Sequence, residues 1–369
     1  MDGGNEKRCE DLFTRQVQNS ARHIPSKILV PLLVIKDSFA AVYGNYRAVS
    51  TQTSTDEREL PNEIIKQILS EAECDPFSFK KTCCIYIEKL CRSGSLSDIA
   101  CLLKDLHDRR ILLTQEAYKI LLVEAAEANN FQLSSLVFKD LLQTNYPLDS
   151  STFTNVAKAF KKTNDTELLL KFIREVAERI FPRSANVINR IMVGFADSRQ
   201  AEKALLIFRE MKNLKCKPDT VTWNIVLAVL VKAGQSDQVL SEFSSMKESG
   251  HVPDLVTYNT LISCFKNKGR MDLCSNFAHE MHGRGINPDL RTYTALIDGY
   301  GRLGNVKEAL KLFDEMKIKK IRPSIYVYRS LISNLKRAGK LELALSLSEE
   351  MALLASQLVG PEDFKRRNR

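Results

Sequence analysis

Residues 256–269 read VTYNTLISCFKNKG, and altered copies of this stretch recur along the chain. Residues 222–228 read TWNIVLA and residues 292–298 read TYTALID, so each threonine–aromatic start lies 35 residues from the next. Self-similarity at a fixed period of 20 to 50 residues is the signature of stacked structural repeats. The chain is therefore expected to be an array of units rather than one ordinary globular core.

Four residue types keep the 35-residue period. Methionine recurs at Met211, Met246, Met281, Met316 and Met351, and glycine recurs at Gly234, Gly269, Gly304 and Gly339. Proline recurs at Pro218, Pro253, Pro288 and Pro323, and a large aromatic recurs at Tyr118, Phe153, Trp223, Tyr258, Tyr293 and Tyr328. These columns predict an array over residues 80–354, with units starting at 80, 115, 150, 185, 220, 255, 290 and, shortened, 325. In the degenerate N-terminal units Asn129 and Asn164 replace the glycine, and asparagine also tolerates a left-handed turn.

Each unit has the pattern of two helices. In the unit from Thr220, apolar residues at helical spacing precede Gly234, and a second apolar stripe follows before Pro253 stops the helix. We expect an all-α fold, a right-handed α-solenoid superhelix of helix-turn-helix 35-residue repeats with a helical cap at 54–79. One helix of each pair should line a concave surface, and the methionine column should be packing.

Composition narrows the functional class. The 369-residue chain has a net charge of +9, which favours an anionic partner without identifying it. Its nine cysteines lack a Cys-x-x-Cys pair, which indicates free thiols rather than a metal or disulfide framework. The longest apolar run, residues 28–35, is too short for a membrane span and is interrupted by Pro31.

The repeated motifs resemble the pentatricopeptide repeat family, specifically the P-type arrays of plant organellar proteins. That family's consensus V-T-Y-N-T-L-I-x-x-x-x-K-x-G is nearly spelled out by residues 256–269, and E-A-L-x-L-F-x-E-M is matched by residues 308–316. Proline–aspartate pairs at 218–219, 253–254 and 288–289 match the end of the repeat. The resemblance is strong from residue 185 onward and weaker over 80–184.

The resemblance implies binding of single-stranded RNA, one base per repeat, read by the fifth and last residues of each unit. Those pairs are Asn189 with Asp219, Asn224 with Asp254, Asn259 with Asp289, Thr294 with Ser324, and Thr154 with Ser184. In family terms, Asn with Asp favours uridine and Thr favours a purine, so the implied RNA is purine-U-U-U-purine. Val221, Val256 and Arg291, each second in its unit, correspond to the residues that stack on bases.

The chemistry of these side chains agrees with that implication. A base edge needs short side chains that supply both a hydrogen-bond donor and an acceptor, which Asn, Asp and Thr provide. We expect the three asparagines to face solvent on the inner wall, and the nucleic-acid assignment fails if they lie on the outer wall or are packed away from solvent. A column of cations on the same period is the candidate for phosphate contacts: Lys162, Lys232, Arg302 and Arg337. Acidic Glu127 and Asp197 interrupt that column.

Each of these columns has a structural alternative. The Asp and Ser column follows a proline and directly precedes a helix, which is also the position of an N-cap. The basic column is equally well explained as a solvated face. The first units, with Cys84 and Lys119 at the fifth position, favour a protein-interaction scaffold, for example a ribosome-associated solenoid with little base selectivity.

The sequence offers no signature of catalysis. It lacks a zinc-deaminase motif, a glycine-rich phosphate loop and a nucleophile elbow, so we expect a non-enzymatic adaptor without cofactors. Residues 1–53 resemble an organellar transit peptide, mitochondrial rather than chloroplast, although four acids among the first eleven residues depart from that pattern. Residues 355–369 form a basic tail.

Overall fold

The computed structural model describes residues 61–92, 96–109, 111–144, 146–180, 185–354 and 358. Within these residues the chain forms 17 α-helices and no strand, which confirms the all-α repeat fold. The predicted transit peptide at 1–53 lies outside the described residues, as does the basic tail apart from Leu358.

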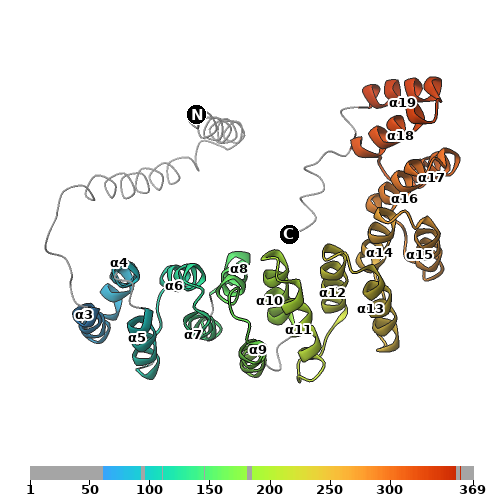
Figure 1. The fold of residues 1–369 in the computed structure, drawn as a ribbon. Coiled ribbons are helices and arrows are strands. Elements are labelled where there is room, and N and C mark those ends of the chain that lie inside the picture. Colours follow the sequence, from blue (N-terminus) through green and yellow to red (C-terminus); the bar gives the residue numbers. More distant parts are fainter. Residues whose placement is uncertain are drawn as a thin grey trace. The chain divides into compact units, whose positions relative to one another are not determined.

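The helices follow one another as pairs along the array (Figure 1). The first helices of the units are α4 (Pro76–Arg92), α6 (Gln115–Glu127), α8 (Ser150–Ala159), α10 (Asn186–Asp197), α12 (Thr220–Lys232), α14 (Leu255–Asn267), α16 (Leu290–Arg302) and α18 (Ile325–Arg337). The second helices are α5 (Leu96–Asp108), α7 (Phe131–Leu141), α9 (Thr166–Ile180), α11 (Ala201–Met211), α13 (Ser236–Glu248), α15 (Met271–Gly283), α17 (Val306–Ile318) and α19 (Leu341–Leu353). Helix α3 (Pro61–Cys74) precedes the first pair and packs on α4 and α5.

The first helices form one continuous layer. Each of them contacts the first helix of the next unit, from α4 through α18. The extensive contacts among the described helices join elements one or two places apart in the chain. This nearest-neighbour pattern is that of a helical repeat solenoid, in which every unit is stabilised by the units on either side of it.

The buried core residues recur with the same 35-residue period as the sequence. Met211, Met246, Met281 and Met316 are fully buried, which confirms that the methionine column is packing. Aromatic rings carry the contact from one unit to the next: Phe208 packs edge-on against Trp223 with ring centroids 4.8 Å apart, and Phe313 packs against Tyr328 at 5.2 Å. Edge-to-face pairs of this kind add stability beyond the apolar area that they bury.

A second periodic contact ties the first helix of a unit to its second helix. The hydroxyls of Tyr258, Tyr293 and Tyr328 donate to Glu280, Glu315 and Glu350, at 3.1, 2.8 and 2.8 Å. Burial, followed by the nearby carboxylate, raises the pKa of Tyr258 to about 12, so the hydroxyl remains protonated at neutral pH. The aromatic column therefore combines a buried ring with one satisfied polar atom.

The turns within the units largely match the glycine column. Gly234, Gly269, Gly304 and Gly339 have φ between 72° and 79°, the left-handed region that glycine adopts at little cost. Asn129 takes the same conformation at φ 52°, as predicted. The prediction for Asn164 is wrong, because it is not among the residues with positive φ. Helix α8 ends early, at Ala159, so the turn of that unit is built differently.

Candidate nucleic-acid interface

The predicted base-contacting residues gather where the first helices begin. Asp219, Asp254 and Asp289 are the N-caps of α12, α14 and α16. Asp254, for example, accepts the backbone N–H of Thr257 at 2.9 Å, while the Thr257 hydroxyl accepts the backbone N–H of Asp254 at 3.0 Å. This reciprocal capping box satisfies two backbone donors at the helix start. The capping alternative is therefore confirmed for the aspartate column.

Each of these aspartates, the last residue of its unit, is joined to the fifth-position asparagine of the same unit. The Asn224 amide donates to the Asp254 carboxylate at 3.1 and 3.2 Å, and its carbonyl accepts the Thr257 hydroxyl at 2.7 Å. The two neighbouring units repeat the arrangement with nearly identical distances, in the sets Asn189–Asp219–Thr222 and Asn259–Asp289–Thr292. We call each set of three side chains a junction triad. The fifth and last residues of the unit are thus brought together in all three cases.

The expectation that these asparagines face solvent is wrong for two of them. Asn189 is 3% exposed and Asn224 is 9% exposed, whereas Asn259 is half-buried. The reason is that the junction triad satisfies the amide within the protein, which removes most of the cost of burying it. The carboxylate is the more accessible member of the triad, since Asp219 is exposed and Asp254 and Asp289 are half-buried.

In the first junction triad the surroundings favour the ionised form of the Asp219 carboxylate. Partial burial opposes ionisation of Asp219, but hydrogen bonds from the backbone and hydroxyl of Thr222 and from Asn189 lower its pKa below the ordinary value of 3.8. An ionised carboxylate is a hydrogen-bond acceptor only, so any partner group at this point must donate.

The two outer pairs are not assembled in the same way. Thr294 donates its hydroxyl to the Leu290 carbonyl at 2.6 Å, and Thr154 donates to the Ser150 carbonyl at 3.0 Å. Ser324 is fully buried and caps α18 by accepting the Val327 N–H at 3.3 Å. These hydroxyls are thus engaged by their own helices. Ser184 lies outside the described residues.

The candidate stacking residues are accessible. Val221 and Val256 are each 57% exposed, unusual for valine, and Arg291 is also exposed. All three stand at the second position of a first helix, three residues before the fifth-position side chain. The sequence interpretation missed Tyr326, which holds the same position in the last unit and is 48% exposed. Its place in the 35-residue register was the available signal.

The basic column is only partly available for phosphate. Lys232 pairs with Asp197 of the preceding unit at 3.2 Å, and Arg302 pairs with Asp298 at 3.0 Å. Asp197, which interrupts the basic column in the sequence, is thus the ion-pair partner of Lys232, the next cation in that column. Lys162 is exposed.

Arg337 has a structural contact that was not predicted. Its guanidinium donates to the carbonyls of Gly301 and Arg302 at 2.9 and 3.1 Å, at the C-terminal end of α16. A cation at a helix C-terminus satisfies carbonyls that have no partner within the helix and complements the helix dipole. The phosphate assignment for Arg337 therefore competes with a role in joining two units.

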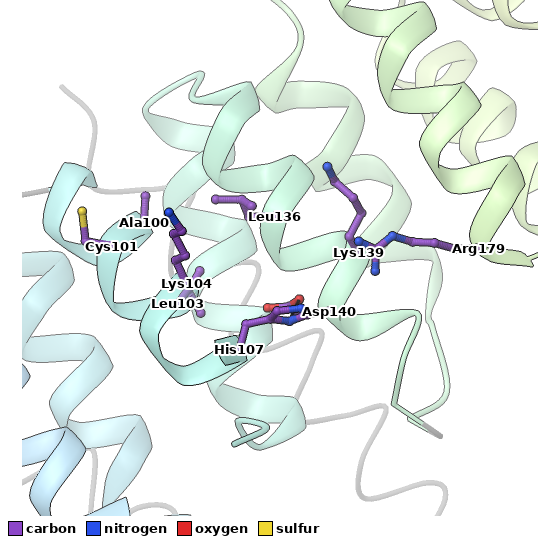
Figure 2. A pocket seen from close by; sticks show the side chains of 9 residues that line it. All are labelled: Ala100, Cys101, Leu103, Lys104, His107, Leu136, Lys139, Asp140 and Arg179. Atoms are coloured by element: carbon purple, nitrogen blue, oxygen red, sulfur yellow. Dashed lines mark ion pairs between the residues drawn. The ribbon is translucent and has the colours of Figure 1, made fainter. Parts of the chain in front are cut away.

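A separate cavity of about 370 Å³ lies among the second helices α5, α7 and α9 (Figure 2). Its apolar lining includes Leu103 and Leu136, and basic side chains surround it: Lys104, His107, Lys139 and Arg179. His107 Nδ1 lies 3.3 Å from the Asp140 carboxylate, whose pKa is raised by burial although His107 and Arg179 oppose that shift. Sequence periodicity gave no signal for this cavity.

The described residues add three observations on metals, thiols and membranes. They contain no cluster of three or more His, Cys, Asp or Glu side chains arranged to hold a metal ion. Their eight cysteines are free; Cys74 and Cys101 are exposed, whereas buried or half-buried thiols were expected, and the other six are buried or half-buried. None of the helices described combines the length and the apolar character that crossing a membrane requires.

Comparison with known proteins shows which residues of the chain match known repeats. The PPR repeat family model matches residues 184–227, 218–267, 253–302 and 292–337, and the PPR repeat model matches residues 326–353. A pentatricopeptide repeat-containing protein of Arabidopsis thaliana is 40% identical over 114 residues, which are 30% of this chain and 31% of that protein. The chain thus matches about a third of the length of that curated relative.

Solved structures with related folds include the pentatricopeptide repeat protein PPR10 from maize, with 17% identity and a TM-score of 0.49 over 85% of this chain and 44% of that one. The same maize protein in complex with an 18-nt psaJ RNA element gives 18% identity and a TM-score of 0.46, over 84% of this chain and 45% of that one. Matches to the family models run without a gap over residues 184–353, the stretch that contains all three junction triads. Over these residues the chain is similar to the pentatricopeptide repeat family.

Proposed function

We propose that the chain binds single-stranded RNA along the starting ends of its first helices, with one nucleotide per unit. The observation that carries the proposal is the repetition of three junction triads at one register, each beside an exposed second-position residue. Side chains that only needed to cap a helix would not require an asparagine partner from the preceding first helix.

The triads favour uracil at three successive positions. The uracil edge presents one N–H donor between two carbonyl acceptors. The ionised carboxylate can accept that N–H, and the second hydrogen of the half-buried Asn259 amide can reach a uracil carbonyl. With Thr154 before the triads and Thr294 after them, the proposed target is purine-U-U-U-purine.

Burial of the asparagines determines how a base can approach. Because Asn189 and Asn224 are covered, a base reaches these units from the carboxylate side, where Asp219 is exposed. Val221, Val256 and Arg291 flank that approach, and an aliphatic side chain or a guanidinium can lie against a base face. Tyr326 adds an aromatic face at the end of the series.

Phosphate contacts should make binding sensitive to salt. Lys232 and Arg302 would exchange their present carboxylate partners for phosphate groups, and the exposed pair of Lys232 with Asp197 contributes little stability. Each phosphate that is neutralised releases counterions, so the binding constant falls as the salt concentration rises.

In the cell, we propose an adaptor that occupies an organellar transcript and acts in its processing, stabilisation, splicing or translation, without catalysis of its own. The organelle assignment rests on the acid-poor segment at residues 15–55, with mitochondrion favoured over chloroplast. Imaging a fluorescent fusion of residues 1–60 in plant cells tests it, and a purely cytosolic signal would contradict it.

The RNA proposal is tested by filter binding of the full chain to U-rich and C-rich single strands across a salt series. We expect tighter binding to the U-rich strand and a loss of affinity with salt. Replacing Asn224 and Asn259 by alanine together should abolish the preference for U while the circular dichroism spectrum stays helical. Equal binding to both strands, or binding to neither, would contradict the proposal.

A protein-interaction scaffold is the second candidate, and the cavity among α5, α7 and α9 favours it. Basic side chains around an apolar floor suit an acidic, partly apolar segment of a partner protein. Under this alternative, Leu136→Asp should abolish partner capture and leave any RNA binding unchanged.

A further inference from the structure

The unit at residues 115–149, which the sequence marks as degenerate, carries a charged pair at the register of the junction triads. Lys119 is its fifth residue and Asp149 is its last. The Lys119 ammonium lies 3.2 Å from Asp149 Oδ2. In the junction triads the asparagine nitrogen lies 3.1 to 3.2 Å from the corresponding aspartate. The distance from nitrogen to carboxylate at this register is therefore kept, while the chemical groups that it joins change.

The two carboxylate oxygens of Asp149 have different tasks. Oδ1 caps α8, accepting the Thr152 N–H at 2.9 Å and the hydroxyls of Thr152 and Ser151 at 2.8 and 2.7 Å. Oδ2 faces Lys119. Hydrogen bonds from Ser151, Thr152 and Lys119 outweigh the effect of burial and hold the pKa of Asp149 well below its usual range.

This pair is open to solvent, unlike the buried asparagines. The side chains of Lys119 and Asp149 are 44% and 45% exposed. An ion pair with that exposure contributes little stability, so a ligand can separate the two groups at small cost. A group inserted between them must offer an acceptor to the ammonium and donors to the carboxylate.

Guanine meets this requirement better than the other bases. Its Watson–Crick edge places two adjacent donors, N1–H and N2–H, beside the O6 acceptor, and N7 is a second acceptor. Uracil has a single donor between two carbonyls, one of which would lie against the carboxylate. Adenine and cytosine offer one donor group each. Charge-assisted hydrogen bonds to both members of the pair are stronger than neutral ones.

We propose that Lys119 and Asp149 make the unit at 115–149 a guanine-selecting unit, which extends the recognised RNA by one nucleotide beyond the first purine. This inference rests on the proposed function. Glu116, the exposed second residue of the unit, offers no stacking face, so selection here depends on hydrogen bonds alone. The preceding unit has Cys84 Sγ beside the Thr114 hydroxyl at 3.4 Å, an uncharged pair with no such preference.

The test measures fluorescence anisotropy of the full chain with four RNA oligonucleotides of sequence N-A-U-U-U-A. We expect the oligonucleotide with N = G to bind about fivefold or more tightly than the other three, within the range for one well-formed base contact. Lys119→Asn recreates the amide–carboxylate pair of the junction triads and should move the preference at N from G to U. Lys158→Asn, at an exposed position of α8, removes the same charge and should leave the preference for G unchanged.

The outcomes separate the two proposals. Equal affinity for all four N, together with tighter binding of U-U-U than of C-C-C at the centre, overturns the guanine assignment alone. Absence of any preference at the central positions overturns the proposed function, and this inference with it. Circular dichroism of each variant establishes that the helices are intact.

Discussion

The units from 185 to 289 and the unit at 115–149 join to their neighbours at the same point with different chemistry. In the later units a buried neutral amide bridges the helix cap and a threonine hydroxyl. At 115–149 an exposed ammonium meets a carboxylate whose other oxygen forms the cap. Because the cap alone starts the next helix, the fifth residue is free to vary without loss of the fold. At 115–149 the fifth residue is also exposed and is therefore available for a ligand.

The largest effect is expected where the two regions meet, between α8 and α10. A Cβ atom on Gly194 would lie 2.5 Å from the backbone oxygen of Phe153, which cannot move independently of its helix. We expect Gly194→Ala to destabilise the chain by about 2–3 kcal/mol, as overpacking does. Gly283→Ala, in open space, is the matched control and should be neutral or slightly stabilising. Chemical denaturation of both variants measures the difference, and equal stabilities would show that the helices separate easily.

The next effect is on RNA affinity and concerns the exposed second residue of a unit, which is aromatic in the last unit and acidic in the unit at 115–149. Tyr326→Ala should weaken binding of a U-rich RNA about tenfold, because stacking of a base on an aromatic contributes about 1–3 kcal/mol. Glu116→Ala, at the same register of the early unit, removes no stacking face and should not weaken binding. Anisotropy titration compares them. If Glu116→Ala lost more affinity than Tyr326→Ala, the early unit rather than the last one would be the main RNA contact.

A smaller effect is expected on the free energy of unfolding, when the threonine of a junction triad and the threonine beside Asp149 are replaced in turn. Thr257→Val orphans the Asn224 carbonyl and the backbone N–H of Asp254, whereas Thr152→Val removes only a bond to the Asp149 cap. We expect Thr257→Val to cost about 1 kcal/mol more than Thr152→Val, since buried polar groups without partners are destabilising. Urea denaturation of the two variants checks this. Equal losses would mean that the amide contributes nothing to the junction.

The smallest effect is a dependence on pH. The pKa of Asp219 is lower in the folded chain than its ordinary value of 3.8, so its contribution to stability is present above that value. That contribution is lost as the pH falls through the folded pKa. For so exposed a group we expect about 0.5 kcal/mol. Asp219→Asn should flatten the dependence of unfolding free energy on pH between pH 5 and pH 3, and an unchanged slope would contradict this.

The period alone determined much of the molecule. Each column of the repeat has one environment, so Met246 could be assigned to the core and Gly234 to a left-handed turn. First helices begin at Thr220, Leu255, Leu290 and Ile325, the residues at which the 35-residue grid starts a unit. Local signals suffice for these features because proline, a capping aspartate and an apolar stripe act within a few residues of one another.

Only the tertiary structure decided what happens between units. The pairing of Asn224 with Asp254 spans 30 residues, and its burial depends on Thr257 of the next helix. The contact of Lys232 with Asp197 and that of Arg337 with the end of α16 also cross from unit to unit. A periodic sequence shows which side chains recur, but whether they face solvent or a neighbouring unit is set by how closely successive helices pack.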